Sequence, residues 1–107
     1  MKRPYIEFHN ADGVRYSIFF RKVTKKDLKG SRAKNAYGVC FSPDSKNPKI
    51  IIDPKLKDKK ALQVLIEEYY HAENFDHPEH KARHFARVLT ELIILLGWTP
   101  PDSKKKS

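Results

Sequence analysis

Two glutamates and a histidine with chemically useful spacing lie in the segment "EEYYH", residues 67 to 71. In a helix Glu67 and His71 share one face, and Glu68 lies roughly 60° around the axis from His71. Metal sites on helices use such i, i+4 pairs because one turn brings two side chains to one ion, and a neighbouring carboxylate can activate water there. The spacing therefore permits a hydrolytic metal site. Exposed helix carboxylates beside a hydrogen-bonded histidine would give the same pattern.

The helix that would carry these residues is predicted from Asp58 or Lys59 to about Asn74. Its apolar residues recur at helical spacing. They are Ala61, Leu62, Leu65, Tyr69 and Ala72.

A second helix is predicted to begin at "DHPE", residues 76 to 79. Asp76 suits the capping position, Pro78 suits the first turn, and Glu79 follows the cap by three residues. Gly97 should end the helix. Its apolar stripe, which we expect to face the core, consists of Ala82, Phe85, Ala86, Leu89, Ile93 and Leu96.

Two pairs of strands should precede the helices. Residues 5–9 and 14–20 alternate in polarity, and the Asp12-Gly13 pair between them is typical of a hairpin turn. Residues 36–41 and 49–53 are the other candidates, joined by the turn-forming "SPDSKNP". Strands followed by helices predict an α+β fold: a small, mostly antiparallel sheet of about four strands, one face of which is covered by two packed helices.

The composition predicts one domain over residues 1–101 and a disordered basic tail over residues 102–107. The single Cys40 cannot form an internal disulfide and no signal-peptide pattern opens the chain, which favours the cytoplasm. The longest apolar run, residues 92–96, is far shorter than the roughly 20 residues that span a membrane, so no membrane partner is expected.

The motif and its surroundings resemble a known family. "LQVLIEEYYHA" is similar to the "vLIHExxHA" helix of zincin-type metallopeptidases, especially the short H-E-x-x-H proteins of phages and bacteria and the SprT-like or minimal gluzincin proteases. The strand "KNPKIIID", the motif helix, a short acidic loop and a helix ending "LLGW" follow in a similar order over about residues 36–98. The resemblance implies a zincin-like fold, zinc or another divalent metal as cofactor, and a peptide or protein substrate. It also implies the host's cytoplasm for a phage-encoded chain.

The resemblance assigns His71 as the second zinc ligand and Glu68 as the general base, but Glu67 stands where the family has its first histidine. A carboxylate can also bind a divalent ion. Its charge makes metal-bound water less acidic, and it crowds Glu68 with a like charge that raises the pKa of Glu68. Glu67 therefore decides between an active enzyme and an inactive relative.

The resemblance places the third metal ligand on the following helix. By helical phase Glu79 lies roughly 70° from the centre of the apolar stripe, whereas His80 and His84 lie on nearly the opposite side. Glu79 is thus the preferred ligand, and His77 in the preceding loop is the alternative. Glu79 could also serve only to stabilise the start of its helix.

Charge supports a second function class. Residues 1–60 carry 16 Lys and Arg against 6 Asp and Glu, whereas residues 61–101 carry 3 against 6. Segment 21–34, predicted as an exposed loop with a helical turn starting at Thr24, could neutralise phosphates. Its basic residues are Arg21, Lys22, Lys25, Lys26, Lys29, Arg32 and Lys34.

Two functions stay open at this stage. One is a metal-dependent, peptidase-like hydrolase in which the strand edge at residues 48–53 aligns an extended peptide by strand addition. The other is a catalytically inactive zincin-like binding protein that contacts nucleic acid through segment 21–34. The sequence leaves the oligomeric state open.

Overall fold

The computed structural model describes residues 6–29 and 37–100 of the 107-residue chain. The predicted tail at 102–107, Arg32 and Lys34 lie outside these residues. In chain order the elements are β1 (Ile6–His9), β2 (Arg15–Phe20), α1 (Lys25–Lys29), β3 (Gly38–Cys40), β4 (Lys49–Ile52), α2 (Asp58–Glu73) and α3 (Glu79–Leu95). None of the helices in the described ranges is long and apolar enough to cross a membrane.

The described strands form one sheet in the order β1-β2-β4-β3. β1 and β2 are antiparallel, as are β3 and β4, while β2 and β4 run parallel with Ile18 opposite Ile50. The prediction of an α+β fold with a mostly antiparallel sheet is confirmed. The expectation that residues 48–53 form a strand edge is wrong, because β4 pairs with a strand on each side.

The β1–β2 hairpin turn is held by the side chain of Asn10. Asn10 Oδ1 accepts hydrogen bonds from the backbone N–H groups of Asp12 and Val14, both at 2.9 Å. Gly13 has a φ of +84°, a left-handed conformation that glycine adopts without steric cost. Asn10 Nδ2 also donates to the carbonyl of Ala72 at 3.0 Å, so the turn that the sequence predicts is tied to the end of α2.

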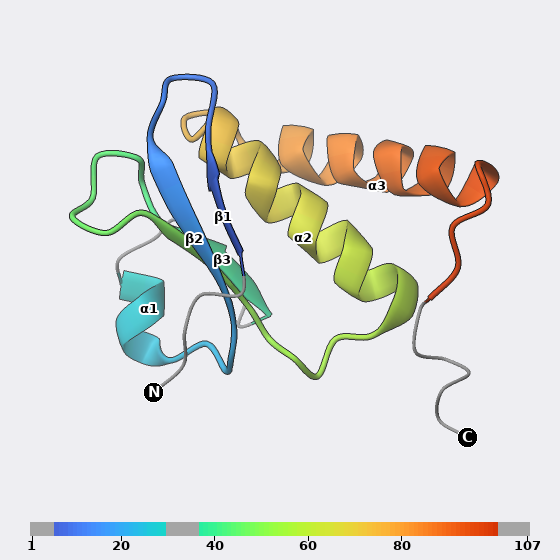
Figure 1. Ribbon diagram of the computed structural model, residues 1–107, viewed down its shortest axis with the longest axis horizontal. Coiled ribbons are helices and arrows are strands. Elements are labelled where there is room, and N and C mark those ends of the chain that lie inside the picture. The colour runs from blue at the N-terminus through green and yellow to red at the C-terminus, as the bar shows by residue number, and fades with distance from the viewer. Residues whose placement is uncertain (1–5, 30–36, 101–107) are drawn as a thin grey trace.

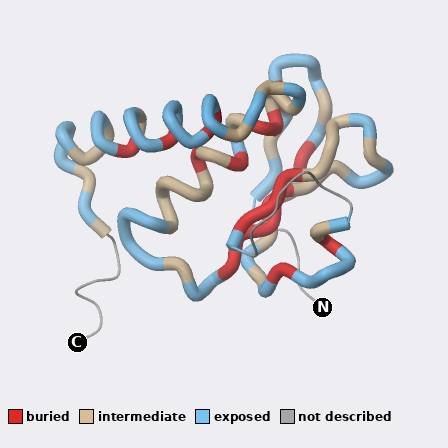
Figure 2. The backbone as a smooth tube through the Cα atoms, turned by 180° about the vertical axis from the view of Figure 1, so that it is seen from behind, coloured by how far each residue is buried: buried red, intermediate tan, exposed pale blue. Residues whose placement is uncertain are grey.

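The core lies on both faces of β4, whose three isoleucines are at most 1% exposed. Successive strand side chains point to opposite faces. Ile50 and Ile52 belong to the cluster that includes Ala72 of α2, whereas Ile51 packs with Val23 and Val39 on the other face. Figure 2 shows this buried strand region in red. Because β4 is a central strand buried on both faces, its three isoleucines can follow one another without an intervening polar residue.

The helices form two successive layers beside the sheet (Figure 1). α2 packs against β3 and β4, and α3 packs against α2. The expectation that both helices cover the sheet is therefore wrong for α3. Small side chains make the innermost part of the α3 contact, since Ala82, Ala86 and Thr90 are fully buried, and at its edge the Phe85 ring packs on Tyr70. Phe85 and Leu96, predicted to face the core, are 42% and 87% exposed.

Helices α1 and α3 differ in how their N-termini are capped. α1 begins with a reciprocal cap in which Thr24 N and Oγ1 donate to Asp27 at 2.8 and 2.9 Å, and Asp27 N donates to Thr24 Oγ1. The predicted helical turn at Thr24 is thus present. At α3, however, Pro78 occupies the cap position and no side-chain hydrogen bond caps the helix, so the predicted capping by Asp76 is wrong.

Gly38 sets how closely β3 approaches α2. A Cβ at this position would lie 2.7 Å from Val64 Cγ1 and 3.2 Å from Glu68 Oε2. Gly38→Ala should therefore lower the free energy of unfolding by about 1–3 kcal/mol, as overpacking does, measured by denaturant unfolding. Adding Val64→Ala removes the closest atom and should recover part of the loss. Unchanged stability in Gly38→Ala would contradict this packing.

Candidate functional site

A polar cluster forms where α2 meets α3. α2 contributes Glu67, Glu68 and His71, and the first residue of α3 contributes Glu79. His71 Nε2 lies 3.3 Å from Glu79 Oε2, and only 5% of the His71 side chain is exposed. Glu79, the preferred candidate for the third ligand, is therefore in direct contact with His71.

Glu68 occupies the side of the cluster nearest the sheet. It is 4% exposed and lies beside Gly38 of β3. Burial, together with the nearby charges of Glu67 and Glu79, raises the pKa of Glu68 to about 8. A carboxyl group that exchanges its proton near neutral pH is suited to general acid–base work.

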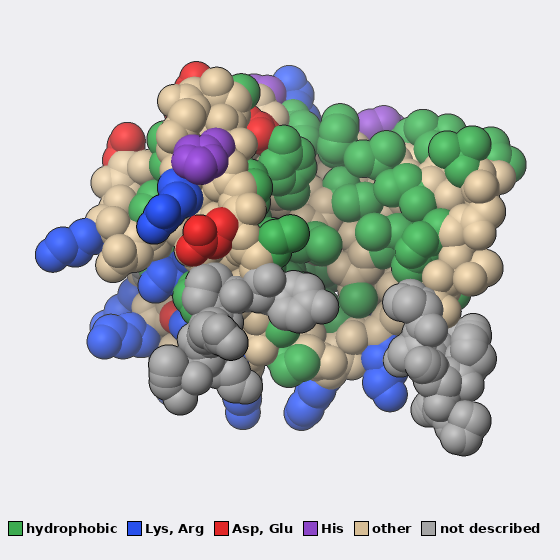
Figure 3. Space-filling model, in the orientation of Figure 1, with side chains coloured by type: hydrophobic (Ala, Val, Ile, Leu, Met, Phe, Trp, Pro, Cys, Tyr) green, Lys and Arg blue, Asp and Glu red, His purple; other side chains and the backbone are tan. Residues whose placement is uncertain are grey.

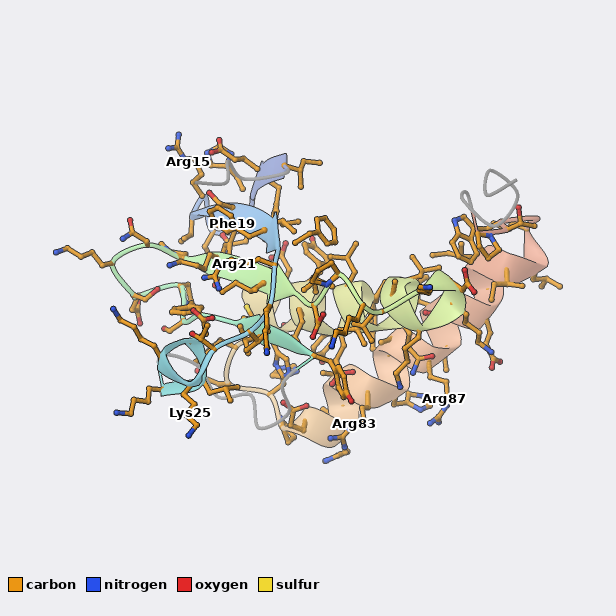
Figure 4. All side chains as sticks on the ribbon, turned by 90° about the horizontal axis from the view of Figure 1, so that it is seen from below. Arg15, Phe19, Arg21, Lys25, Arg83 and Arg87 are labelled. Carbon is orange, nitrogen blue, oxygen red and sulfur yellow. The ribbon has the colours of Figure 1, made fainter. Side chains whose placement is uncertain are left out.

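Glu67 shares the environment of Glu79. Burial raises the pKa of Glu67 to about 7, together with the charge of Glu79 and a hydrogen bond between the two carboxyl groups. Arg83 and Lys60 act in the opposite direction. In Figure 4 Arg83 projects from α3 on the same side as Arg87. The carboxyl group of Glu67 therefore binds its proton up to about neutral pH, because ionising it beside Glu79 is unfavourable.

The donor types of this cluster fit a divalent cation. Carboxylate oxygens and an imidazole nitrogen are ligands for zinc and related ions, and buried carboxylates need a positive partner or a proton. The placement of these side chains, however, is not that of ligands around a metal ion, because His71 and Glu67 each contact Glu79. Within residues 6–29 and 37–100, no three His, Cys, Asp or Glu side chains are arranged as a metal-binding group. A metal ion would have to replace these mutual contacts.

The other histidines lie in different surroundings. His77 Nδ1 is 2.6 Å from Tyr70 Oη, and the His77 ring packs against the Tyr70 ring with their centres 5.6 Å apart. His80 and His84 are exposed and line a shallow hollow with Tyr70, Lys81 and Phe85. The helical phase that predicted His80 and His84 to point away from the core is correct.

Residue selection by chemistry alone missed Gly38, Lys60 and Arg83. Gly38 carried a usable signal, since a lone glycine inside a strand pattern often marks a close backbone approach. Lys60 carried one as well, since it precedes Glu67 by seven residues, two turns of the same helix. Arg83 carried none, because its distance from Glu67 depends on how α3 crosses α2.

The basic segment is only partly available for binding phosphate. Arg21 makes two hydrogen bonds to the Asp27 carboxylate, at 2.9 and 3.1 Å. Burial alone would raise the pKa of Asp27, but hydrogen bonds from Arg21 and Thr24 lower it to about 2. Within residues 21–29 of this segment, the exposed basic residues are Lys22, Lys25, Lys26 and Lys29. Lys25 projects away from α1 in Figure 4.

The buried carboxyl of Glu68 predicts a dependence of stability on pH. Its pKa is about 8 in the folded chain against an ordinary 4.5, so the folded state binds more protons between these values. The stability it contributes is fully present below about pH 4.5 and is lost as the pH rises through about 8. The loss amounts to a few kcal/mol, at about 1.4 kcal/mol per pH unit for one proton.

Glu68→Gln keeps the shape of the protonated acid and cannot ionise. Its melting temperature should therefore vary less across this pH window and exceed that of the natural chain at the alkaline end. Glu91→Gln, at an exposed position on α3, is the matched control and should follow the natural chain. Equal pH profiles for Glu68→Gln and the natural chain would contradict the assignment.

Comparisons with known proteins add no evidence about function to this geometry. No family model matches the chain, and neither a curated protein nor a solved structure is significantly similar to it. Any functional conclusion therefore rests on the cluster between α2 and α3 and on the resemblance of its motif.

Proposed function

We propose that this chain is a small zincin-like, metal-dependent hydrolase of peptides. In this proposal Glu67, His71 and Glu79 bind a divalent ion and Glu68 is the general base. One observation carries the proposal: three carboxyl groups and an imidazole from two helices meet in a largely buried cluster, with His71 Nε2 3.3 Å from Glu79 Oε2. Clusters of groups with displaced pKa values are typical of functional sites.

The protein's own residues supply acid–base chemistry. Glu68 has a pKa of about 8, so from about pH 8 its ionised form can accept a proton from an attacking water and return it to the leaving amine. Packing beside Gly38 and Val64 restricts the movement of its side chain. A divalent ion, when bound, supplies Lewis-acid polarisation of the scissile carbonyl.

A peptide substrate would lie along β3. Among the described strands, β3 is an outer strand that pairs with β4, and it packs against α2 next to Glu68. Strand addition at an outer strand gives backbone hydrogen bonds to an extended peptide. This assignment replaces the one to residues 48–53, which lie inside the sheet.

Metal binding tests the proposal directly. The chain, purified without a polyhistidine tag, should bind one equivalent of Zn²⁺ or Mn²⁺ by calorimetry. His71→Ala and Glu79→Gln should each weaken the affinity at least tenfold, about 1.4 kcal/mol. His84→Ala, at an exposed histidine of α3, is the matched control and should bind as the natural chain does. Glu67→His should raise the zinc affinity, because imidazole, a good zinc ligand, replaces a carboxyl group whose pKa of about 7 makes protons compete with the metal.

The variant Glu68→Gln separates hydrolysis from metal binding. It should retain the metal and lose hydrolysis of an unstructured protein such as casein by at least a hundredfold, the usual contribution of a general base. Absence of metal binding at pH 8, with unchanged melting in chelator, would overturn the proposal. Salt-sensitive binding to DNA that is lost in a Lys25→Glu, Lys26→Glu variant would then favour the inactive binding protein.

A further inference from the structure

A row of large apolar side chains lies on the outside of α3. Phe85, Val88, Leu92, Leu95 and Leu96 are between 40% and 87% exposed. The first four follow one another at intervals of three, four and three residues, the spacing at which a helix presents a seam to another helix. We call these five residues the α3 seam. Figure 3 shows that hydrophobic side chains also dominate the visible face of the molecule over α2 and α3.

One seam residue, Phe85, also takes part in the contact that holds α3 in the fold, because its ring packs on Tyr70 of α2 with ring centres 5.0 Å apart. α3 packs on α2 through Ala82, Ala86 and Thr90, which are fully buried. Around the helix, at about 100° per residue, Val88, Leu92 and Leu95 lie on the side opposite these residues. The helix therefore folds with its small residues innermost and these three large apolar residues outward, although burying large apolar side chains would stabilise a lone chain.

We propose that the α3 seam is the interface of a homodimer, in which α3 packs antiparallel on α3 of a second copy. A two-fold axis on the seam side of α3, at the level of residue 90 along the helix, brings Phe85 opposite the partner's Leu95, and Val88 opposite the partner's Leu92. Each copy offers the same surface, as a two-fold interface requires. The partner is a second copy because the seam is complementary to itself in this register.

Charge at the ends of the seam favours the antiparallel arrangement. Lys81 lies one step beyond Phe85 on the same side of the helix, and this register puts it beside the end of the partner's α3. The last turn of α3 contains no basic residue. A cation there is favourable, because the final carbonyl groups carry partial negative charge. In a parallel pair Lys81 would instead face the partner's Lys81.

The area of the seam suits a dimer of modest affinity. A fully exposed large apolar side chain offers about 200 Å², so the five residues at their exposed fractions offer roughly 600 Å² in each copy. Two copies thus bury about 1,200 Å², the lower end of the range for a specific interface. This exposed apolar area is also at the upper end of the range of apolar patch sizes on monomeric proteins.

The arrangement is tested by molar mass and by mutation. Sedimentation equilibrium over a range of micromolar concentrations should show reversible association to twice the chain mass of 12.5 kDa. Leu92→Lys should raise the dimer dissociation constant at least tenfold. Ile6→Lys is the matched control, since Ile6 on β1 is 52% exposed and Leu92 is 50% exposed; it should leave the dimer intact. Lys81→Glu should weaken the dimer, with a smaller effect at high salt.

Cross-linking tests the register. Val88→Cys mixed with Leu92→Cys should form a disulfide-linked pair under oxidation faster than either variant alone. The natural Cys40 is buried and does not compete. Circular dichroism confirms that each variant is folded. A monomer at every concentration, a dimer unaffected by Leu92→Lys, or faster cross-linking of Val88→Cys alone would overturn the proposal. None of these measurements depends on metal, so this proposal and the proposed function fail independently.

Discussion

Burial of α2 on two sides is the constraint on which the other features of this structure depend. One side packs on β3 and β4, where Gly38 lets the strand approach Val64 and Glu68. The other side packs on α3, whose first residue contacts His71. A helix enclosed in this way cannot place all its polar residues in water. The fold therefore accepts the cost of buried carboxyl groups, which is commonly tolerated at functional sites.

The replacement of a histidine by Glu67 changes the balance between protons and metal. With a neutral imidazole in place of Glu67, the cluster would carry one negative charge fewer. With Glu67 present, burial and the charge of Glu79 raise its pKa, and the two carboxyl groups share a hydrogen bond. Protons and a divalent ion therefore compete for the same oxygens. Metal binding at such a cluster releases protons and becomes stronger as the pH rises.

Local chemistry allowed much of the fold to be predicted from the sequence. The Asp12-Gly13 turn needs only neighbouring residues, and both long helices follow from periodicity over several turns. The candidate residues Glu67, Glu68 and His71 were found in the same way. The parallel pairing of β2 with β4 could not be predicted, because it joins segments about 30 residues apart. The position of β4 inside the sheet, and hence the error about residues 48–53, follows from that pairing.

The error about α3 has a different origin. Apolar residues cover more than half of its circumference, so periodicity identifies a helix without telling which part of the apolar arc faces inward. Side-chain size decides this, because Ala82 and Ala86 allow a close approach to α2 that Val88 and Leu92 would prevent. The large residues are then left on the outside. By helical phase, Glu79 and Arg83 lie away from the α3 seam. A second copy docked on the seam therefore leaves the side of α3 that bears Glu79 and Arg83 uncovered, and one helix can serve both surfaces.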